Sequence, residues 1–313
     1  MSVLMAVALS LVSAVCYATA AVLQERTAAG AASLRSALSR GSWWGSVALN
    51  GGGALLHVVA LRYGPLTLVQ PLGALSLVVA VPLGSLVTRR RTSGRQWRGT
   101  ALTLVGLAAL LAATASGGVP VDTLGTGEVF LVALTAAGAV VALVRFASGR
   151  QFASGRRSAT PGGGLAFAAA SGIASGVGST LAQKLAVGPT SSWSLVAVAV
   201  LTVGFATTGV LLSQKAYRSG LGGPLAVLTL VNPVAASAIG ITLLGEGVQW
   251  GAFGGLGGLL ALVGAGAAAR GVLLLSLPRA EAQQGVSVQE AAAEGVGELT
   301  GVVNLTGMSR AAL

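Results

Sequence analysis

Long, uninterrupted apolar stretches dominate this chain, separated by short polar or basic segments. A helix needs roughly 20 mainly apolar residues to cross the ~30 Å hydrocarbon core of a bilayer. Nine stretches are near that length, and they cover residues 3–23, 43–61, 65–87, 99–115, 129–146, 165–181, 193–212, 224–244 and 250–275. The pattern predicts an all-α polytopic membrane protein with about nine transmembrane helices.

The composition supports a membrane protein and excludes some kinds of site. Of the 313 residues, 54% are hydrophobic and only 9% charged, and the mean hydropathy is +0.82. A soluble domain carries roughly 25% charged residues. Cys16 is the only cysteine, so neither an intrachain disulfide nor a cysteine-based zinc site can form. The first stretch is too long for the apolar region of a cleaved signal peptide.

The basic residues predict how the chain sits in its membrane. When the loops are assigned alternately to two sides, 17 of the 19 Lys and Arg residues fall on one side. Only Arg62 and Lys184 fall on the other. Loops rich in Lys and Arg stay in the cytoplasm, which predicts an external N-terminus and a cytoplasmic C-terminus. Heavy use of Ala, Gly, Val and Arg is typical of a GC-rich bacterial genome, so we expect a bacterial cytoplasmic membrane.

The net charge of +11 follows from this loop asymmetry. It favours topology determinants, with contact to anionic lipid, over a nucleic-acid surface, because no basic stripe lies on a soluble domain.

An internal duplication is visible in the phrases LTLVQP (66–71) and LTLVNP (228–233). Five spans separate the two copies, so they cross the membrane in opposite directions. In the same arrangement AVLQER (21–26), at the end of the first span, corresponds in place to TLAQKL (180–185), at the end of the sixth. We therefore predict a first repeat at 1–116, a connecting span with a basic loop at 117–160, and a second repeat at 161–277. Residues 278–313 are predicted to form a disordered cytoplasmic tail.

Each duplicated phrase ends in a carboxamide followed by proline, Gln70-Pro71 and Asn232-Pro233. Proline lacks an N–H and frees a carbonyl one turn earlier. Inside lipid that carbonyl needs a partner in protein or in a water-lined cavity, and interrupted helices at matching positions mark the substrate sites of secondary transporters. Two interpretations stay open: the pairs border a translocation cavity, or they are proline kinks whose carboxamides bond neighbouring helices.

Other polar side chains inside or beside the spans are further candidates. His57, the only histidine, together with Tyr17 and Gln183, forms a second rank of predicted cavity-lining residues, with packing as the alternative for each. Glu246 and Glu25, at span ends, are candidates for ion coupling. Glycines spaced four residues apart in the stretch 251–258 allow close helix approach, either within the bundle or in a homodimer.

Five features of the sequence occur together: Trp43-Trp44, the glycines at 51–53, YGPLTLVQPLGALS (63–76), LTLVNP and LLGEGVQW (243–250). In these features the chain resembles the drug/metabolite transporter superfamily, and within it the EamA-like and NIPA-like, magnesium-transporter-like branch. It implies an alternating-access carrier with a central cavity between two halves. In span two, where magnesium-transporting members are expected to have an intramembrane Glu and Asn, this chain has Ala54 and His57.

The sequence therefore predicts a secondary transporter of a small solute, with no cofactor and no enzymatic activity. It has no phosphate-binding loop for ATP and no paired-carboxylate or Ser/His/Asp set. The shortage of membrane carboxylates favours a neutral, zwitterionic or anionic solute over a divalent cation. Two alternatives remain: a Mg²⁺ or other divalent-cation facilitator of the NIPA-like type, and a non-transporting membrane scaffold.

Overall fold

The computed structural model describes residues 2–60, 62–63, 72–89, 91–114, 125–153, 161–187, 192–243 and 256–277. The chain divides into a unit spanning Met1–Ser276 and a remainder, Leu277–Leu313. All the helices below belong to the first unit. The predicted disordered tail, 278–313, lies outside the described residues.

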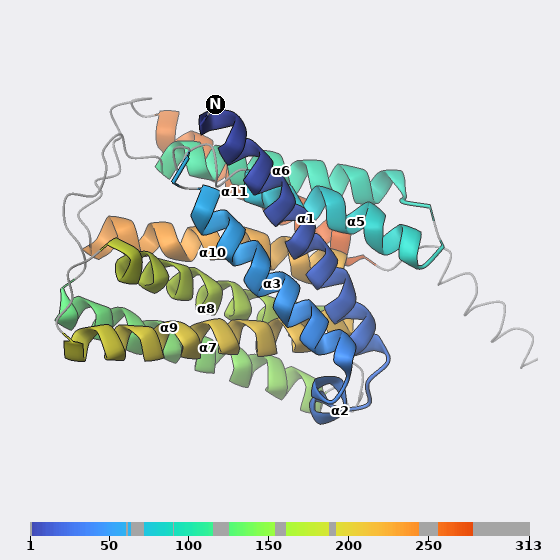
Figure 1. Ribbon diagram of the computed structural model, residues 1–313. Helices are drawn as coiled ribbons and strands as arrows, with labels where there is room; N and C mark the ends of the chain where they lie inside the picture. Colours follow the sequence, from blue (N-terminus) through green and yellow to red (C-terminus); the bar gives the residue numbers. More distant parts are fainter. Residues whose placement is uncertain are drawn as a thin grey trace, which may run out of the picture. The chain divides into compact units, whose positions relative to one another are not determined.

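Every regular element among the described residues is a helix, and no strand occurs among them (Figure 1). The first part of the chain forms α1 (Ser2–Ala29), α2 (Leu34–Leu38), α3 (Gly41–Ala60), α5 (Ser76–Val87) and α6 (Gly94–Thr114). The second part forms α7 (Thr126–Ala153), α8 (Pro161–Val187), α9 (Ser192–Ala216), the 3₁₀ helix η1 (Tyr217–Ser219), α10 (Gly222–Leu243) and α11 (Leu256–Ser276).

Five helical segments are long and apolar enough to cross a membrane: Val3–Ala29, Gly127–Gly149, Gly162–Ala182, Trp193–Ser219 and Leu259–Ser276. Two shorter apolar helices cover Leu72–Val87 and Gly222–Ala236. The prediction of an α-helical membrane protein is therefore confirmed in its coarse form. Each of the nine predicted stretches overlaps a helix, but the count of nine crossings stays a prediction.

Local side-chain caps explain where several helices begin. Ser93 and Gln96 form a reciprocal capping box at the start of α6, in which the Ser93 N–H donates to Gln96 Oε1 and the Gln96 N–H donates to Ser93 Oγ. Ser33 Oγ accepts the Ser36 N–H at the start of α2. The sequence pattern did not predict α2, because a helix of five residues has no detectable apolar period.

Helix α1 is longer than predicted, since it continues beyond residue 23 to Ala29. Its last turns carry polar side chains, which an apolar-run criterion excludes. Two of these side chains, Gln24 and Thr27, are buried by tertiary contacts. Thr27 Oγ1 bonds to the Leu23 carbonyl and lies 2.8 Å from Ser42 Oγ. The helix therefore ends where its burial ends and not where its apolar run ends.

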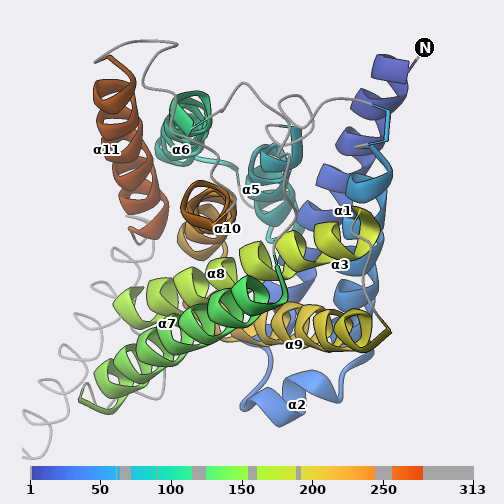
Figure 2. The ribbon, with the colours of Figure 1, turned by 90° about the vertical axis from the view of Figure 1, so that its left-hand side faces the viewer.

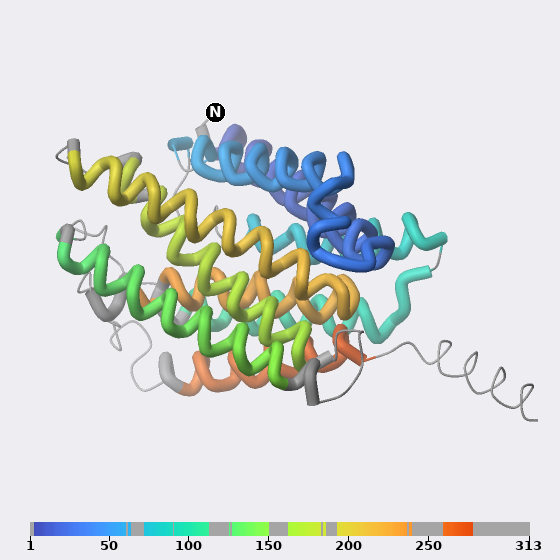
Figure 3. The backbone as a smooth tube through the Cα atoms, turned by 90° about the horizontal axis from the view of Figure 1, so that it is seen from below, coloured from blue at the N-terminus to red at the C-terminus, as the bar shows by residue number. Residues whose placement is uncertain are grey.

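The same pairing of helices occurs in both parts of the chain. In the first part, α1 packs against α3 and α5; in the second, α8 packs against α9 and α10. Helices α5 and α10 are followed by α6 and α11, which pack closely against each other (Figure 2). Figure 3 shows α7, α8 and α9 lying side by side, as their mutual contacts require.

Two apolar clusters hold the helices together. One is built mainly from α7, α8 and α9 and includes Phe167, Leu181 and Phe205. The other joins α1 and α5 to η1, α10 and α11 and includes Leu77, Tyr217 and Leu225. Because the second cluster draws side chains from both parts of the chain, it joins them, as the packing of α6 against α11 also does.

Candidate functional site

Asn232, the carboxamide residue of the second duplicated phrase (228–233), lies against α8. A Cβ placed on Gly176 would come within 2.6 Å of the Asn232 carbonyl oxygen and 3.3 Å of its Oδ1, and Gly172 would meet the Asn232 backbone nitrogen at 3.3 Å. The half-buried Asn232 therefore needs the two glycines of α8 as close neighbours. The structure places its carboxamide at a helix–helix contact within the second part of the chain.

The predicted interruption at Pro233 is wrong for the helix as it stands, because α10 continues through Pro233 to Leu243. The missing proline N–H leaves the Thr229 carbonyl without its helical partner. A helix inside a bundle tolerates this loss when neighbouring elements cover the site. Here Gly172 and Gly176 let α8 approach closely beside the proline, at Val231, Asn232 and Ala235, and the helix does not end.

The whole of the first phrase (66–71), with Gln70 and Pro71, lies outside the described residues, as does Glu246. The chain resumes at Leu72, and there His57 is close: a Cβ on Gly73 would lie 3.3 Å from His57 Cε1. His57 Nδ1 is buried and has no hydrogen-bond partner among the described residues. The histidine of α3 is therefore next to the segment that directly follows Pro71.

Tyr17 lies between α1 and α3, with its ring carbons 3.3 Å from the position of a Cβ on Gly53. This contact is one of packing. Gln183 is in the last turns of α8, and its side chain lies outside the description. Glu25 is half-buried near the end of α1, beside the exposed Arg26. The structure thus brings His57 to Gly73, which follows the first phrase, and Asn232 to α8. It does not bring His57, Tyr17 and Asn232 into one described cavity.

Two similar hydrogen bonds join α1 to α3 in the first part and α8 to α9 in the second. Ser13 Oγ of α1 donates to the Gly53 carbonyl of α3 at 2.7 Å. Ser171 Oγ of α8 donates to the Gly209 carbonyl of α9, also at 2.7 Å. Both serines are completely buried. The same residue types make the same bond between corresponding helices, although no shared phrase of sequence surrounds them.

A buried amide cluster, which we define as Gln24, Ser213 and Gln214, connects the first part of the chain to the second. Ser213 Oγ donates to Gln24 Oε1 at 3.0 Å, and Gln214 Nε2 donates to the Gln24 carbonyl at 3.2 Å. Gln24 and Gln214 are 1% and 2% exposed. Sequence reasoning did not include Gln24 or Ser213 among the site residues. The sequence did contain a signal, because the polar residues Ser213 and Gln214 directly precede Lys215 in an otherwise apolar stretch. Polar side chains in such a helix need buried hydrogen-bond partners.

Neither of two hollows among the described residues is lined by a predicted site residue. One is a groove of about 710 Å³ along α6 and α11, with apolar walls and the arginines Arg95, Arg98 and Arg270. The other is a polar cavity of about 130 Å³ beside the amide cluster, lined by α1, α2, α7, α8, α9 and η1. Within the described ranges, no three His, Cys, Asp or Glu side chains come together as a metal site would require.

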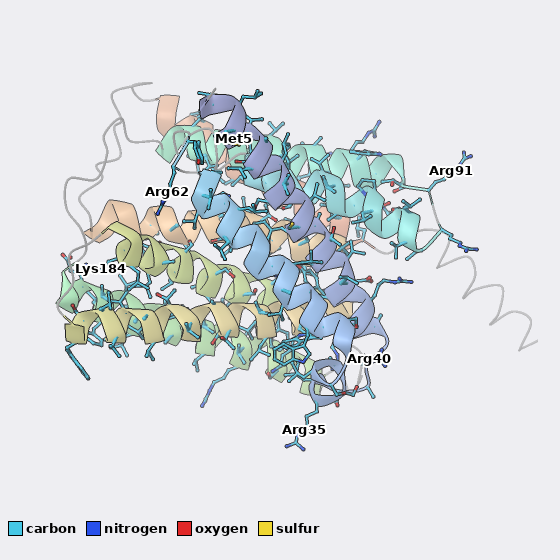
Figure 4. The ribbon with its side chains drawn as sticks, viewed as in Figure 1. Met5, Arg35, Arg40, Arg62, Arg91 and Lys184 are labelled. Carbon is cyan, nitrogen blue, oxygen red and sulfur yellow. The ribbon has the colours of Figure 1, made fainter. Side chains whose placement is uncertain are left out.

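The charged side chains separate toward two ends of the helical unit. Figure 4 shows Arg62 and Lys184 at one end, and Arg35, Arg40 and Arg91 at the other. Met5, near the start of α1, lies toward the end that carries Arg62. The two residues that the loop count set apart therefore lie toward the same end in this view. We call the opposite end, which carries Arg35, Arg40 and Arg91, the basic end.

No family model, no curated protein and no solved structure matches this chain. The likeness to the drug/metabolite transporters therefore remains a resemblance in the residues of a few sequence phrases.

Proposed function

We propose that this protein is a secondary transporter that moves a small solute across a bacterial cytoplasmic membrane by alternating access between two inverted halves. The observation that carries the proposal is the repeated construction of the helical unit. The buried bonds Ser13–Gly53 and Ser171–Gly209 join equivalent helices, and the helix pairings of the first part recur in the second. Inverted repeats of this kind are the usual architecture of secondary transporters.

The separation of charged residues supports the orientation of these halves. Short loops rich in arginine stay on the cytoplasmic side. The basic end with Arg35, Arg40 and Arg91 is then cytoplasmic, and the end with Arg62 and Lys184 is external (Figure 4). The N-terminus of α1 is external in this proposal, in keeping with the place of Met5.

The helix pairs α1–α9 and α3–α8 make unequal contacts among the described residues, which supports an alternating mechanism. Helix α1 packs against α9 through the amide cluster. Among the described residues, α3 and α8 make no comparable contact. Ser213 corresponds in position to His57, because each follows its bonded glycine, Gly209 or Gly53, by four residues. Gln183 corresponds to Gln24, because each is the fourth residue of its phrase, TLAQKL or AVLQER.

These correspondences suggest which contacts exchange during transport. The amide cluster closes the basic end in the conformation described above. In the opposite conformation, Gln24 separates from Ser213, and Gln183 approaches His57 at the other end. Movement of one repeat against the other around a central site produces this exchange, and the glycine contacts between α8 and α10 move with the second half.

The test begins with a thermal-shift screen of the purified protein against metabolites and ions, followed by counterflow of any hit in proteoliposomes. The Gln24→Cys/Ser213→Cys pair, in a Cys16→Ser background, then locks the basic end by oxidation. We expect exchange to stop on oxidation and to return with a reductant, whereas each single cysteine variant is unaffected by the oxidant. Undiminished exchange through fully cross-linked protein would overturn the mechanism.

In the same assay, Gln70→Ala and Asn232→Ala test the paired carboxamides. We expect each to reduce exchange several-fold with normal expression, because each removes a hydrogen-bonding group beside the duplicated proline. Thr135→Ala is the matched control, since its hydroxyl bonds only to carbonyls of its own helix at an exposed position. If exchange is unchanged in both variants, the carboxamides do not belong to the transport site.

A further inference from the structure

The polar cavity of about 130 Å³ is built from both parts of the chain. Its polar and charged lining consists of Ser33 at the start of α2, Ser148 of α7, Gln214 and Lys215 of α9, and Arg218 of η1. A water molecule requires only ~10–15 Å³ of such space. The cavity therefore has room for a tetrahedral oxyanion and a short polar substituent.

Two cations face this small space. Lys215 Nζ is 5.5 Å from the centre of the Phe167 ring, which also lines the cavity. Arg218 donates from Nη2 to the Ala31 carbonyl at 3.0 Å, which uses one of its five N–H groups. Among the residues that the structure describes, neither Lys215 nor Arg218 forms an ion pair with a carboxylate. Their combined charge favours an anion in the cavity.

The third feature is a buried acceptor. Gln214 is 2% exposed, and its Nε2 is committed to the Gln24 carbonyl. Its Oε1 has no hydrogen-bond partner among the described residues, and the residue lines the cavity. A buried acceptor without a donor costs about 1–3 kcal/mol. A ligand that binds the cations and reaches Gln214 Oε1 must therefore supply both negative charge and a hydrogen-bond donor.

We propose that this cavity is a binding site for a phosphate group that carries a hydroxyl. A carboxylate or a sulfate is ionised at neutral pH and offers acceptors only. A phosphate with its second pKa near 6 retains a proton in part of its population, and a phosphodiester headgroup such as that of phosphatidylglycerol has hydroxyls on its glycerol. Both sources present oxyanion oxygens and an O–H donor together.

The place of the cavity fits either source. The helix α2, whose preceding residue Ser33 lines the cavity, carries Arg35, which Figure 4 shows at the basic end. A cytoplasmic leaflet rich in anionic lipid attracts such an end, and soluble phosphates are also available on that side. Because Gln214 bonds to Gln24, a bound ligand would also restrain the contact between α1 and α9. The binding itself does not depend on the transport proposal.

Binding is measured on the purified full-length protein in neutral detergent, without prior addition of anionic lipid. Thermal unfolding is followed with inorganic phosphate or with sulfate at equal ionic strength. Native mass spectrometry is performed with phosphatidylglycerol or phosphatidylcholine. We expect a higher unfolding midpoint with phosphate than with sulfate, or selective retention of phosphatidylglycerol. A response to phosphate alone identifies a soluble ligand, and a response to the lipid alone identifies a headgroup.

Variants locate the response. Arg218→Gln removes one charge from an exposed residue and should weaken the apparent affinity roughly tenfold, the value of one charge-assisted hydrogen bond. Gln214→Leu removes the acceptor and should abolish the preference for phosphate over sulfate. Arg35→Gln, on an exposed residue of the same end and outside the lining, should leave the response unchanged.

The proposal fails if phosphate and sulfate raise the unfolding midpoint equally and phosphatidylglycerol is not selectively retained, because that result indicates ionic screening. It also fails if neither phosphate nor phosphatidylglycerol produces a response, or if Arg35→Gln weakens binding as much as Arg218→Gln. If Gln214→Leu does not fold, the comparison of Arg218→Gln with Arg35→Gln still decides the matter.

Discussion

At the scale of single residues, two serine hydroxyls hold equivalent helix pairs at their closest approach. Each donates to a glycine carbonyl of the neighbouring helix at 2.7 Å. Both acceptor positions favour glycine, since a Cβ at Gly53 would lie 3.3 Å from the Ser13 carbonyl oxygen and one at Gly209 would lie 2.7 Å from Ser175 Oγ. Interhelical bonds of this type in membranes contribute on average about 0.6 kcal/mol and at most about 1.7 kcal/mol.

We predict that Ser13→Ala and Ser171→Ala each lower the free energy of unfolding by about 0.5–1.5 kcal/mol, and by similar amounts. The measurement is denaturant or thermal unfolding in a fixed detergent. Thr207→Ala should be neutral, because its exposed hydroxyl bonds only to the Val203 carbonyl of its own helix. A large loss in one serine variant and none in the other would show that the two bonds are not equivalent.

At the scale of elements, α6 and α11 approach each other through small residues. A Cβ on Gly106 would lie 2.5 Å from the Ala268 nitrogen and 2.8 Å from the Ala268 Cβ, and one on Gly264 would lie 2.9 Å from the Gly106 carbonyl. Such distances are shorter than van der Waals contact, so the backbones can be this close only without side chains. This is the small-residue packing expected between membrane helices.

We predict that Gly106→Ala destabilises the protein by more than 1 kcal/mol, because α6 and α11 must separate to admit the methyl group. Gly266→Ala, in α11 but with nothing within 4 Å of the new Cβ, should be neutral or stabilising. Alanine is favoured over glycine in a helix interior by about 1 kcal/mol. Unfolding of both variants in one detergent checks the prediction, and equal effects would contradict this helix contact.

At the scale of the whole helical unit, the distribution of charge predicts the orientation. Arg62 lies at one end, and Arg35 and Arg40 lie at the basic end. Tyr63 follows Arg62 and is 44% exposed, and the exposed Ser39 precedes Arg40. These two positions therefore report on opposite sides of the membrane.

We predict that, in a Cys16→Ser background, a membrane-impermeant maleimide labels Tyr63→Cys in intact cells. Ser39→Cys should be labelled only after the cells are permeabilised. The physical reason is that arginine-rich loops are retained in the cytoplasm. Labelling of Ser39→Cys alone in intact cells would reverse the orientation, and with it the assignment of the basic end to the cytoplasm.

The fold class was predictable because it depends on the total hydrophobicity of long segments and not on individual contacts. The apolar stretches require helices in a membrane wherever they lie in space, and the duplicated phrases and the position of Arg62 and Lys184 are properties of the sequence alone. Helix ends were less predictable. Helix α1 continues to Ala29 because Gln24 and Thr27 are buried by partners that no local pattern identifies.

The candidate site was predictable only in part, for the same reason. The sequence identified His57 and Asn232 as polar groups beside the duplicated phrases, but the glycines of α8 decide that Asn232 packs at a helix contact and that α10 passes through Pro233.

By itself, the sequence determined that this chain is helical and apolar enough for a membrane, and that it carries one phrase almost identically twice. Hydrophobicity and sequence identity are properties of the residues in order. Only the tertiary structure decided that Gln24 meets Ser213 and Gln214, and that Lys215 and Arg218 face one cavity. Those contacts join residues almost 190 positions apart, and the partner of a buried polar group depends on which helices pack together.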